Sequence, residues 1–427
     1  MEIFDSIVIG AGQAGLAMSA CLRLRGIRHV VLERGRVAER WRSERWDSFR
    51  LLSPNWQTRL PGHHYRGTDP DGFMTASEVV ELLEKYAATA PVRTGVTVSS
   101  VTAQDGGYRV ASSAGVLWCR NVIVATGDLD RPRVPQIAAE LPTDLVQLHS
   151  SEYRNSDQLP AGAVLVVGAG PSGQQIADEL ARAGRDVHIA VGRHQMLPRR
   201  YRGQDSYWWL DRLGMLSRTV DTLAHLDDRF APNAVLTGGT ADLDLNRLVR
   251  AGVHPHGRLL GFDGTTLTFA ADLVRTYTSA EANAVRFRLS VDDYINRTGA
   301  ADAPAATTGS TAAGMPAAFW LHRDSRSLDL RAANLVGVIW ATGFTADRSW
   351  LPAGALDASG EPRQNRGVSA LPGIYFLGLK WQHRRSSHTI DGVGRDAEFL
   401  TEHIVDRFVE RAELQLQQSF QREGVAA

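Results

Sequence analysis

The chain has 427 residues, which is enough for two or three domains of ordinary size. Hydrophobic residues make up 43% of it and charged residues 22%, so most of the chain can bury a core. The 47 basic residues equal the 47 acidic ones, which gives no reason to expect a nucleic-acid or anionic-membrane partner.

The N-terminal segment is apolar but does not match a signal peptide. Residues 3–22 lack a basic leading region, and glycines interrupt them in a strand–turn–helix pattern. No run of about 18 apolar residues occurs elsewhere, so no membrane-spanning helix is expected. The two cysteines, Cys21 and Cys119, cannot form a CxxC pair. We expect both to be buried thiols, which fits a reducing, cytoplasmic setting.

One pattern occurs twice along the chain. Residues 7–15 read IVIGAGQAG, and residues 164–173 read VLVVGAGPSG. Each is a short apolar run followed by GxGxxG and by a helical pattern that ends at a glycine, Gly26 or Gly184. A second apolar run follows in both cases. The sequence therefore predicts two β-α-β units.

A second pair of similar segments lies after the glycine motifs. Residues 122–127 read VIVATG and residues 338–343 read VIWATG, and each predicts a buried strand that ends in a small-residue turn. The order of motifs predicts an α/β fold with two Rossmann-like dinucleotide-binding domains of the three-layer ββα kind. We expect a discontinuous first domain, residues 1–157 and 331–427, with the second domain, residues 158–330, inserted into it.

Two hairpins are predicted from their turn residues. Residues 95–110 should form strands that turn at Asp105-Gly106-Gly107. Residues 258–269 should form a second hairpin around Asp263-Gly264.

Three further segments are interpreted from composition. Residues 201–229 are rich in Trp, Leu and Asp and predict helix; the run Tyr207-Trp208-Trp209-Leu210 within them caps a substrate tunnel or packs in a core or dimer contact. Residues 298–318 contain few large side chains and predict a loop. Residues 397–421 predict an amphipathic C-terminal helix.

The residues beyond the glycine motifs distinguish the two loops. Glycines in a GxGxxG turn let the backbone approach a pyrophosphate, and the next helix offers free N–H groups. Eighteen residues after Gly15 stands Glu33, whose carboxylate suits an adenosine ribose. The same offset from Gly173 leads to Val191, with Arg193 close by, so no acid repels a 2′-phosphate and a guanidinium is at hand. We therefore assign FAD to the first loop and NADPH to the second.

The tandem motifs resemble those of the class B flavin-dependent monooxygenases, which include flavin-containing monooxygenases, plant YUCCA enzymes and bacterial N-hydroxylases. The resemblance runs from Ile7 to about Leu400. Within it, ATGF followed by Trp350-Leu351 looks like the family, and residues 45–55, RWDSFRLLSPN, resemble the YUCCA segment that lies along the flavin.

The family pattern FxGxxxHxxx(Y/F) is half kept between the two glycine loops. His149 and Tyr153 match it, whereas Thr143 and Leu145 stand at the Phe and Gly positions. His149 is either a functional group at the domain junction or a structural histidine beside a linker.

The resemblance implies the reaction. NADPH reduces FAD by hydride transfer, and a flavin hydroperoxide then passes one oxygen atom to nitrogen, sulfur or an activated carbon of a small-molecule substrate. Such chemistry needs alignment and exclusion of water, but no metal and no protein nucleophile. Asn55 and Gln57 are the candidate catalytic residues, as hydrogen-bond partners of the flavin or the nicotinamide, or else they belong to an ordinary polar loop. A homodimer is also expected from the resemblance.

Two other functions remain open. The first is an NAD(P)H-dependent flavin oxidoreductase or oxidase that inserts no oxygen, which the half-kept pattern favours. The second is a non-catalytic flavin sensor, which would not need the second nucleotide loop.

A basic segment, residues 379–396, lies after the last predicted strand. It either meets an acidic substrate or the NADPH phosphates, or it is a solvated surface loop; its basic side chains are Lys380, His383, Arg384, Arg385 and His388. The spacing of its two histidines does not match a metal site.

The expected nucleotide contacts combine the motifs with positions that the resemblance implies, among them Glu33, Arg34 and Trp41. Arg199 and Arg200 are further candidates for the 2′-phosphate, unless they form a solvated turn. The full set is Gly10, Gly12, Gln13, Ala14, Gly15, Glu33, Arg34, Trp41, Ala125, Thr126, Gly127, Gly168, Gly170, Pro171, Ser172, Gly173, Arg193, Thr342, Gly343 and Gly378.

Overall fold

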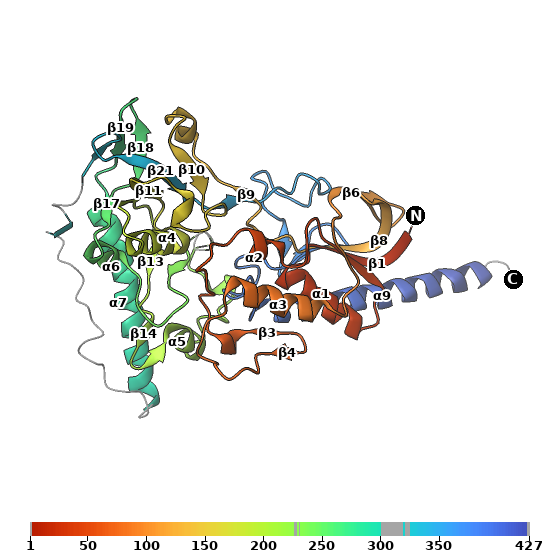
Figure 1. Cartoon of the computed structure of the whole chain (residues 1–427). Coiled ribbons are helices and arrows are strands. Elements are labelled where there is room, and N and C mark those ends of the chain that lie inside the picture. The colour runs from red at the N-terminus through yellow and green to blue at the C-terminus, as the bar shows by residue number, and fades with distance from the viewer. Residues whose placement is uncertain (1, 226–228, 230, 300–318, 321–324, 425–427) are drawn as a thin grey trace.

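Two largely parallel sheets lie at opposite ends of the molecule, and each carries one helix that begins at a glycine motif (Figure 1). The computed structural model describes residues 2–225, 229, 231–299, 319–320 and 325–424. This arrangement confirms the predicted α/β fold class with two dinucleotide-binding units.

The first sheet is built on the first β-α-β unit, in which helix α1 (Gln13–Leu24) joins two neighbouring parallel strands. In spatial order its main strands are β23 (Gln364–Asn365), β24 (Val368–Ser369), β25 (Ile374–Phe376), β8 (Gly115–Val124), β1 (Glu2–Ile9), β2 (His29–Leu32) and β5 (Val92–Arg93). The strands from β25 to β5 are parallel, so their carboxyl ends share one edge, where the first glycine loop lies.

A hairpin extends the first sheet on the amino-terminal half of β8. Strands β6 (Val98–Gln104) and β7 (Gly107–Ser112) pair with each other, and β7 pairs with β8. Asp105 and Gly106 both have positive φ, +50° and +74°, as a two-residue hairpin turn requires. The first predicted hairpin is confirmed.

The second sheet is fully parallel and is built on the second β-α-β unit, in which helix α4 (Pro171–Arg182) joins two strands. In spatial order its strands are β10 (Val146–His149), β21 (Leu335–Trp340), β11 (Ala163–Val167), β12 (Val187–Ala190) and β17 (His254–His256).

The strands β10 and β21 correct the expected domain boundaries. Both belong to the second sheet, although β10 lies before residue 158 and β21 lies after residue 330. Pairing explains this, because the second VIWATG strand lies against β11 just as the first VIVATG strand, in β8, lies against β1. Each ATG motif therefore serves the glycine loop of its own sheet.

Two short strands join the two units. The segments just after the ATG turns pair with each other, as β9 (Arg131–Pro132) and β22 (Phe344–Thr345). The Arg133 N–H donates to the Gly343 carbonyl at 2.9 Å, and the Thr342 hydroxyl donates to the Arg133 carbonyl. The connections between the units are thus tied together beside the second ATG turn.

The remaining elements surround these sheets. The further helices are α2 (Glu39–Ser43), α3 (Ala76–Ala87), α5 (Ser206–Arg212), α6 (Leu245–Arg250), α7 (Leu273–Thr298) and α9 (Val393–Gly424). The further strands are β3 (Arg59–Leu60), β4 (His63–His64), β13 (Gln195–Met196), β14 (Arg200–Tyr201), β15 (Gln204–Asp205), β16 (Ala234–Val235), β18 (Leu259–Phe262), β19 (Thr266–Phe269) and β20 (Ser327–Asp329).

These elements decide the other sequence predictions. The hairpin around Asp263-Gly264 is confirmed by β18 and β19, and α9 confirms the C-terminal helix, which extends beyond the body of the protein (Figure 1). Of the described residues in 201–229, α5 confirms the helical prediction, and the others form turns, short strands and 3₁₀ turns, so for them it is wrong. The predicted loop at 298–318 lies outside the described residues from residue 300 onward.

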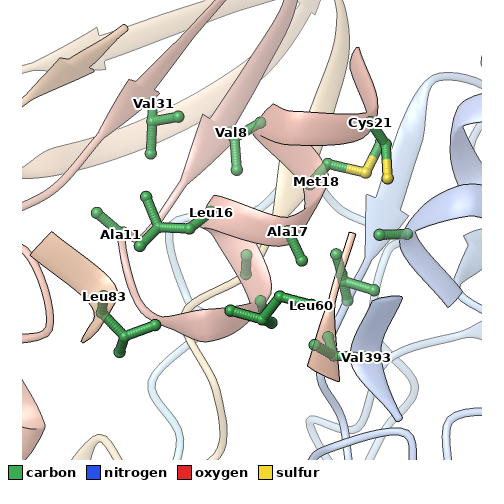
Figure 2. Packing of buried hydrophobic residues seen from close by; sticks show 14 of the residues in the cluster. Val8, Ala11, Leu16, Ala17, Met18, Cys21, Val31, Leu60, Leu83 and Val393 are labelled. Atoms are coloured by element: carbon green, nitrogen blue, oxygen red, sulfur yellow. The ribbon is translucent and has the colours of Figure 1, made fainter. Parts of the chain in front are cut away.

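The core of the first unit packs on helix α1. Figure 2 shows Leu16, Ala17 and Met18 of this helix between Val8 of β1 and Val393 at the start of α9. Cys21 and Cys119 are both buried and unpaired with each other, as predicted, and burial raises the pKa of each thiol to about 12. Among the described residues, no helix is both long and apolar enough to cross a bilayer.

Candidate functional site: two glycine loops

The first glycine loop is held against the ATG turn of β8. Gly10 has φ +107°, and a Cβ added there would lie 2.6 Å from the Ala125 carbonyl oxygen. A Cβ on Gly15 would lie 1.8 Å from the Gly10 carbonyl oxygen. The Ala125 N–H donates to the Ile9 carbonyl at 2.9 Å, which brings the two strand ends together. Only glycine satisfies both positions, because a side chain would push the strands or the helix apart.

The second glycine loop repeats this geometry against its own ATG turn. Gly168 has φ +114°, and its Cβ would lie 2.4 Å from the Ala341 carbonyl oxygen. A Cβ on Gly173 would lie 1.9 Å from the Gly168 carbonyl oxygen. The Ala341 N–H donates to the Val167 carbonyl, again at 2.9 Å. The two loops are therefore equivalent in structure as well as in sequence.

The middle glycines face open space and leave room for a pyrophosphate. Gly12 and Gly170 are the N-caps of α1 and α4, and a Cβ on either would meet no protein atom within 4 Å. No side chain caps either helix, and neither first turn contains an acid. Both helix ends thus present free N–H groups and a positive dipole end, which suits a pyrophosphate.

Glu33 lies just after the second strand of the first unit and points back to the glycine loop. Its carboxylate accepts hydrogen bonds from the Ala11 N–H at 2.7 Å and the Gly35 N–H at 2.8 Å. The carboxylate lies at the carboxyl edge of the sheet, beside the loop, where a ribose hydroxyl can be bound.

The second unit has no acid at the corresponding place. Val191 is fully buried, and Arg193, two residues later, is exposed. Within the described part of the chain, the Arg193 side chain has no hydrogen bond or ion pair. A free cation beside the second loop fits a ribose 2′-phosphate.

Two residues that the resemblance implied lie beside the first loop. The Trp41 indole N–H donates to the side-chain oxygen of Gln13, the first residue of α1, at 3.3 Å. Arg34 instead forms an ion pair with Asp130 at 2.7 Å, and its side chain is 56% exposed. Trp41 therefore borders the loop directly, whereas Arg34 is bound to the segment after the first ATG turn.

The candidate catalytic residues occupy a buried 3₁₀ turn, η1 (Asn55–Gln57). Asn55 is 6% exposed and Gln57 is 3% exposed, so neither lies in an ordinary polar surface loop. The Asn55 amide nitrogen donates to the Asp69 carbonyl at 2.9 Å, but its oxygen is buried without a partner among the described residues, as is the Gln57 amide nitrogen. Buried polar atoms normally have partners, so a bound molecule is a reasonable source of the missing hydrogen bonds.

The structure contradicts the prediction that Arg199 is a phosphate ligand. Its side chain is fully buried and paired with Asp205. It also donates to the Leu52 carbonyl at 2.8 Å and the Thr237 carbonyl at 3.0 Å, and it lies over the Phe73 ring. It is neither free to bind a phosphate nor part of a solvated turn. It joins the segment before η1 to the second unit, a role that no local sequence pattern indicates.

Arg200, by contrast, is exposed and donates to the Gly203 carbonyl at 2.8 Å. It lies in the two-residue strand β14, so it stays a surface residue near the second unit.

His149 and Tyr153 are structural rather than free groups. One ring nitrogen of His149 hydrogen-bonds the Gly343 carbonyl at 3.0 Å and the other the Ser151 hydroxyl at 2.8 Å. Burial lowers the pKa of His149, so its ring is neutral at physiological pH. Tyr153 is fully buried and donates to Glu179 at 2.8 Å. The structural alternative for His149 is the one that these contacts favour.

The basic segment begins where the first sheet ends. Gly378 lies after β25 with φ +87°, and a Cβ there would lie 2.8 Å from the Ala14 Cβ at the start of α1. The segment then contacts the second unit: the Arg385 N–H donates to the Arg218 carbonyl at 3.0 Å, and the Ser386 N–H donates to the Leu216 carbonyl at 3.2 Å. It is therefore not a solvated surface loop.

Burial decides the interpretation of the aromatic run in α5. Trp209 is 1% exposed, and its indole N–H donates to the Tyr201 carbonyl at 2.7 Å, so the core interpretation holds for it. Among the described residues, no group of three or more His, Cys, Asp or Glu side chains is arranged to hold a metal ion.

Asp128 is a site residue that the sequence analysis missed. It comes directly after the first ATG turn, and it pairs with the buried Arg348. Its second oxygen accepts from the Lys380 backbone N–H at 3.4 Å. The sequence signal for Asp128 is its position directly after the first ATG motif.

A family model described as pyridine nucleotide-disulphide oxidoreductase matches residues 7–225, just over half of the chain. The chain belongs to this family. Its matched region contains both glycine loops and the first ATG turn. Membership bears out the expected enzyme class, an oxidoreductase with a flavin and a pyridine nucleotide, and the expected pair FAD and NADPH.

Individual relatives extend the likeness over nearly all of the chain. A protein named "Uncharacterized oxidoreductase CzcO-like" from Geobacillus kaustophilus is 32% identical over 95% of this chain and 99% of its own length. An indole-3-pyruvate monooxygenase, YUCCA1 of Oryza sativa subsp. japonica, is 34% identical over 52% of this chain and 57% of its own. The resemblance to class B flavin-dependent monooxygenases is thus confirmed.

The fold itself matches a solved flavoprotein. A flavin-containing monooxygenase from Stenotrophomonas maltophilia has a TM-score of 0.65 and 21% identity, over 95% of this chain and 99% of that chain. At 21% identity, this match shows that the two chains share a fold, and nothing more.

Proposed function

We propose that this protein is an FAD-containing, NADPH-dependent monooxygenase that oxygenates a nitrogen, sulfur or activated carbon centre of a small molecule. The observation that carries the proposal is the pair of equivalent glycine loops, one with Glu33 after its second strand and the other with Val191 and the free Arg193. One loop suits a ribose with free hydroxyls, and the other suits a ribose that carries a 2′-phosphate.

The residues of the chain supply binding and positioning in this proposal. FAD, once bound, accepts a hydride from NADPH and activates molecular oxygen. Glu33 binds the adenosine ribose of FAD, while the N-termini of α1 and α4 bind one pyrophosphate each. The unsatisfied Asn55 oxygen and Gln57 amide nitrogen hold the reacting rings in place, and the burial of η1 keeps water from them.

A flavin oxidase that inserts no oxygen is the second candidate. His149 is one of the two retained residues of the family pattern. Its two ring nitrogens already hydrogen-bond to the Gly343 carbonyl and the Ser151 hydroxyl, so neither is free to take part in oxygen chemistry. Thiol–disulfide exchange, which the family name suggests, is disfavoured because both cysteines are buried thiols in different core clusters.

The test separates these functions in one preparation. The purified protein is expected to show a bound-flavin spectrum and to be reduced anaerobically by NADPH much faster than by NADH. Admission of oxygen with a panel of amines, sulfides and ketones should then yield an oxygenated product in proportion to the NADPH consumed. Stoichiometric hydrogen peroxide with every substrate would favour the oxidase, and absence of bound flavin would overturn both.

A further inference from the structure

Three buried or partly buried arginines in this protein are each paired with a carboxylate. Arg199 pairs with Asp205, Arg348 pairs with Asp128, and Arg384 lies 3.4 Å from Asp396. This is expected, because a charge removed from water is costly unless it is paired.

Lys380 and Arg385 differ from these three arginines. Both are half-buried, and within the described chain neither side chain has a carboxylate partner. The Lys380 ammonium has one hydrogen bond there, to the Ala231 carbonyl at 2.5 Å, and the Arg385 guanidinium has none to any described residue. Burial, followed by their mutual repulsion, lowers the pKa of Lys380, and burial lowers that of Arg385. Two half-buried cations therefore lie in one short segment without a carboxylate hydrogen-bond partner among the described residues.

His388 adds an unsatisfied polar atom to the same cluster. Its Nδ1 is buried without a partner among the described residues. Burial, and then the positive charges of Lys380 and Arg385, lower the pKa of His388 to about 4. The negative charge of Asp128 acts to raise this pKa. The ring is therefore neutral at physiological pH, and it offers one hydrogen bond rather than a third charge.

The cluster lies where the two units meet. Its segment follows Gly378, which lies against Ala14 of the first glycine loop. On its other side it bonds to residues 216–220 of the second unit, and Tyr207 of α5 is near enough to act on the pKa of Arg385. The segment that carries the two cations thus lies at the junction between the first glycine loop and the second unit, and the Lys380 ammonium is bonded to the second unit at Ala231.

The geometry points to an oxyanion subsite in which Lys380 and Arg385, assisted by His388, bind the carboxylate of the substrate. This inference rests on the proposed function, and it narrows the substrate to small molecules that carry an acid group. A phosphate of NADPH presents the same chemistry, so the test distinguishes these two sources. A guanidinium and an ammonium together suit a carboxylate that no described protein acid occupies.

The experiment follows ligand binding through the absorbance of the bound flavin, without turnover. The holoenzyme is titrated with phenylacetate, with the neutral phenylacetamide and, separately, with NADP⁺, at constant ionic strength. The variants are Arg385→Gln and Lys380→Gln. Arg218→Gln is the matched control, because Arg218 is an exposed neighbour already bonded to Thr222. Flavin content and melting temperature are measured for each variant.

The expected result is that phenylacetate binds and phenylacetamide binds at least tenfold more weakly. Each variant should weaken phenylacetate by about tenfold or more, because a charge-assisted hydrogen bond is lost, while NADP⁺ binding and the Arg218→Gln control stay near wild type. If only NADP⁺ weakens, the subsite belongs to the nucleotide and the substrate assignment is overturned.

Equal binding of acid and amide, with both unchanged in the variants, would overturn the subsite altogether. Because bound flavin and its reduction by NADPH are recorded on the same wild-type sample, these results are distinguishable from a failure of the proposed function. If one variant does not fold, the other still tests the charge.

Discussion

The two glycine loops have almost the same backbone geometry and different surroundings. In each, the first glycine approaches the alanine carbonyl of an ATG turn and the third glycine approaches the carbonyl of the first. They differ in the residues after the second strand, which are an acid bonded to the loop in one unit and a buried valine with a free arginine in the other. We therefore propose that the glycines make each loop fit for a dinucleotide, and that the residues after the second strand select which dinucleotide it is.

The largest effect is expected from filling the tight contacts. Gly15→Ala and Gly173→Ala each place a Cβ within 2 Å of a backbone carbonyl oxygen, so the backbone must move. We expect each to lower the free energy of unfolding by about 3 kcal/mol or more, measured by urea unfolding. Gly239→Ala, whose Cβ would lie 3.7 Å from its nearest neighbour, is the control. Equal stability of all three would show that the contacts are looser than described.

The middle glycines separate the two loops by cofactor. Gly12→Ala and Gly170→Ala meet no protein atom within 4 Å, so neither should alter the stability of the apoprotein by more than about 0.5 kcal/mol. Gly12→Ala should purify without flavin. Gly170→Ala should retain its flavin spectrum but lose most of its reduction by NADPH. Loss of flavin in both variants would contradict the assignment of one nucleotide to each loop.

The charged residues test which nucleotide each loop selects. Arg193→Gln should raise the KM for NADPH by about tenfold to a hundredfold and leave that for NADH nearly unchanged, because only the 2′-phosphate loses its partner. Glu33→Gln should weaken FAD binding without changing the NADPH preference. Arg200→Gln is the matched control for Arg193. An equal rise in both KM values would remove Arg193 from 2′-phosphate recognition.

Low pH should lower the free energy of unfolding through His188 in the second sheet, which hydrogen-bonds His256 at 2.9 Å. Burial, followed by the neighbouring His256, lowers the pKa of His188 to about 4. A depressed histidine pKa means that the unfolded chain binds the proton first, so stability is present above about pH 6.5 and declines as the pH falls toward 4. The decline from this group is about 3 kcal/mol at most.

Urea unfolding at pH 7.5 and pH 5 measures this difference. His188→Gln should make stability less dependent on pH, whereas His254→Gln, at a half-exposed side chain, should not. Identical pH profiles for wild type and His188→Gln would show that other groups cause the acid sensitivity.

The smallest effect is expected at the cysteines. Cys21→Ala and Cys119→Ala remove buried thiols with raised pKa values, and each should cost about 1 kcal/mol of stability through lost packing. Reduction of bound flavin by NADPH and the product yield should not change. A loss of turnover in either variant, with flavin retained, would revive thiol–disulfide chemistry.

The regular features of the fold were predictable from short stretches of sequence. The two β-α-β units, the hairpin turns at Asp105-Gly106 and Asp263-Gly264, and the C-terminal helix depend on local spacing and on glycine conformation. Helix α7 was not predicted, although its buried residues recur every three or four positions; they are Leu273, Tyr277, Ala280, Ala284, Phe287 and Val291. This spacing is a local signal of an amphipathic helix.

Local sequence was enough to predict the two equivalent glycine loops and the unlike residues that follow their second strands, Glu33 in one unit and Val191 with Arg193 in the other. Three other features emerged only from the folded chain: β21 joins the second sheet, Arg199 is a buried bridge, and Lys380 and Arg385 are withdrawn from solvent without a described carboxylate partner. The difference is one of range. Turns and helices depend on neighbours along the chain, whereas the pairing of strands and the partner of a charge depend on residues that are distant in sequence and close only after folding.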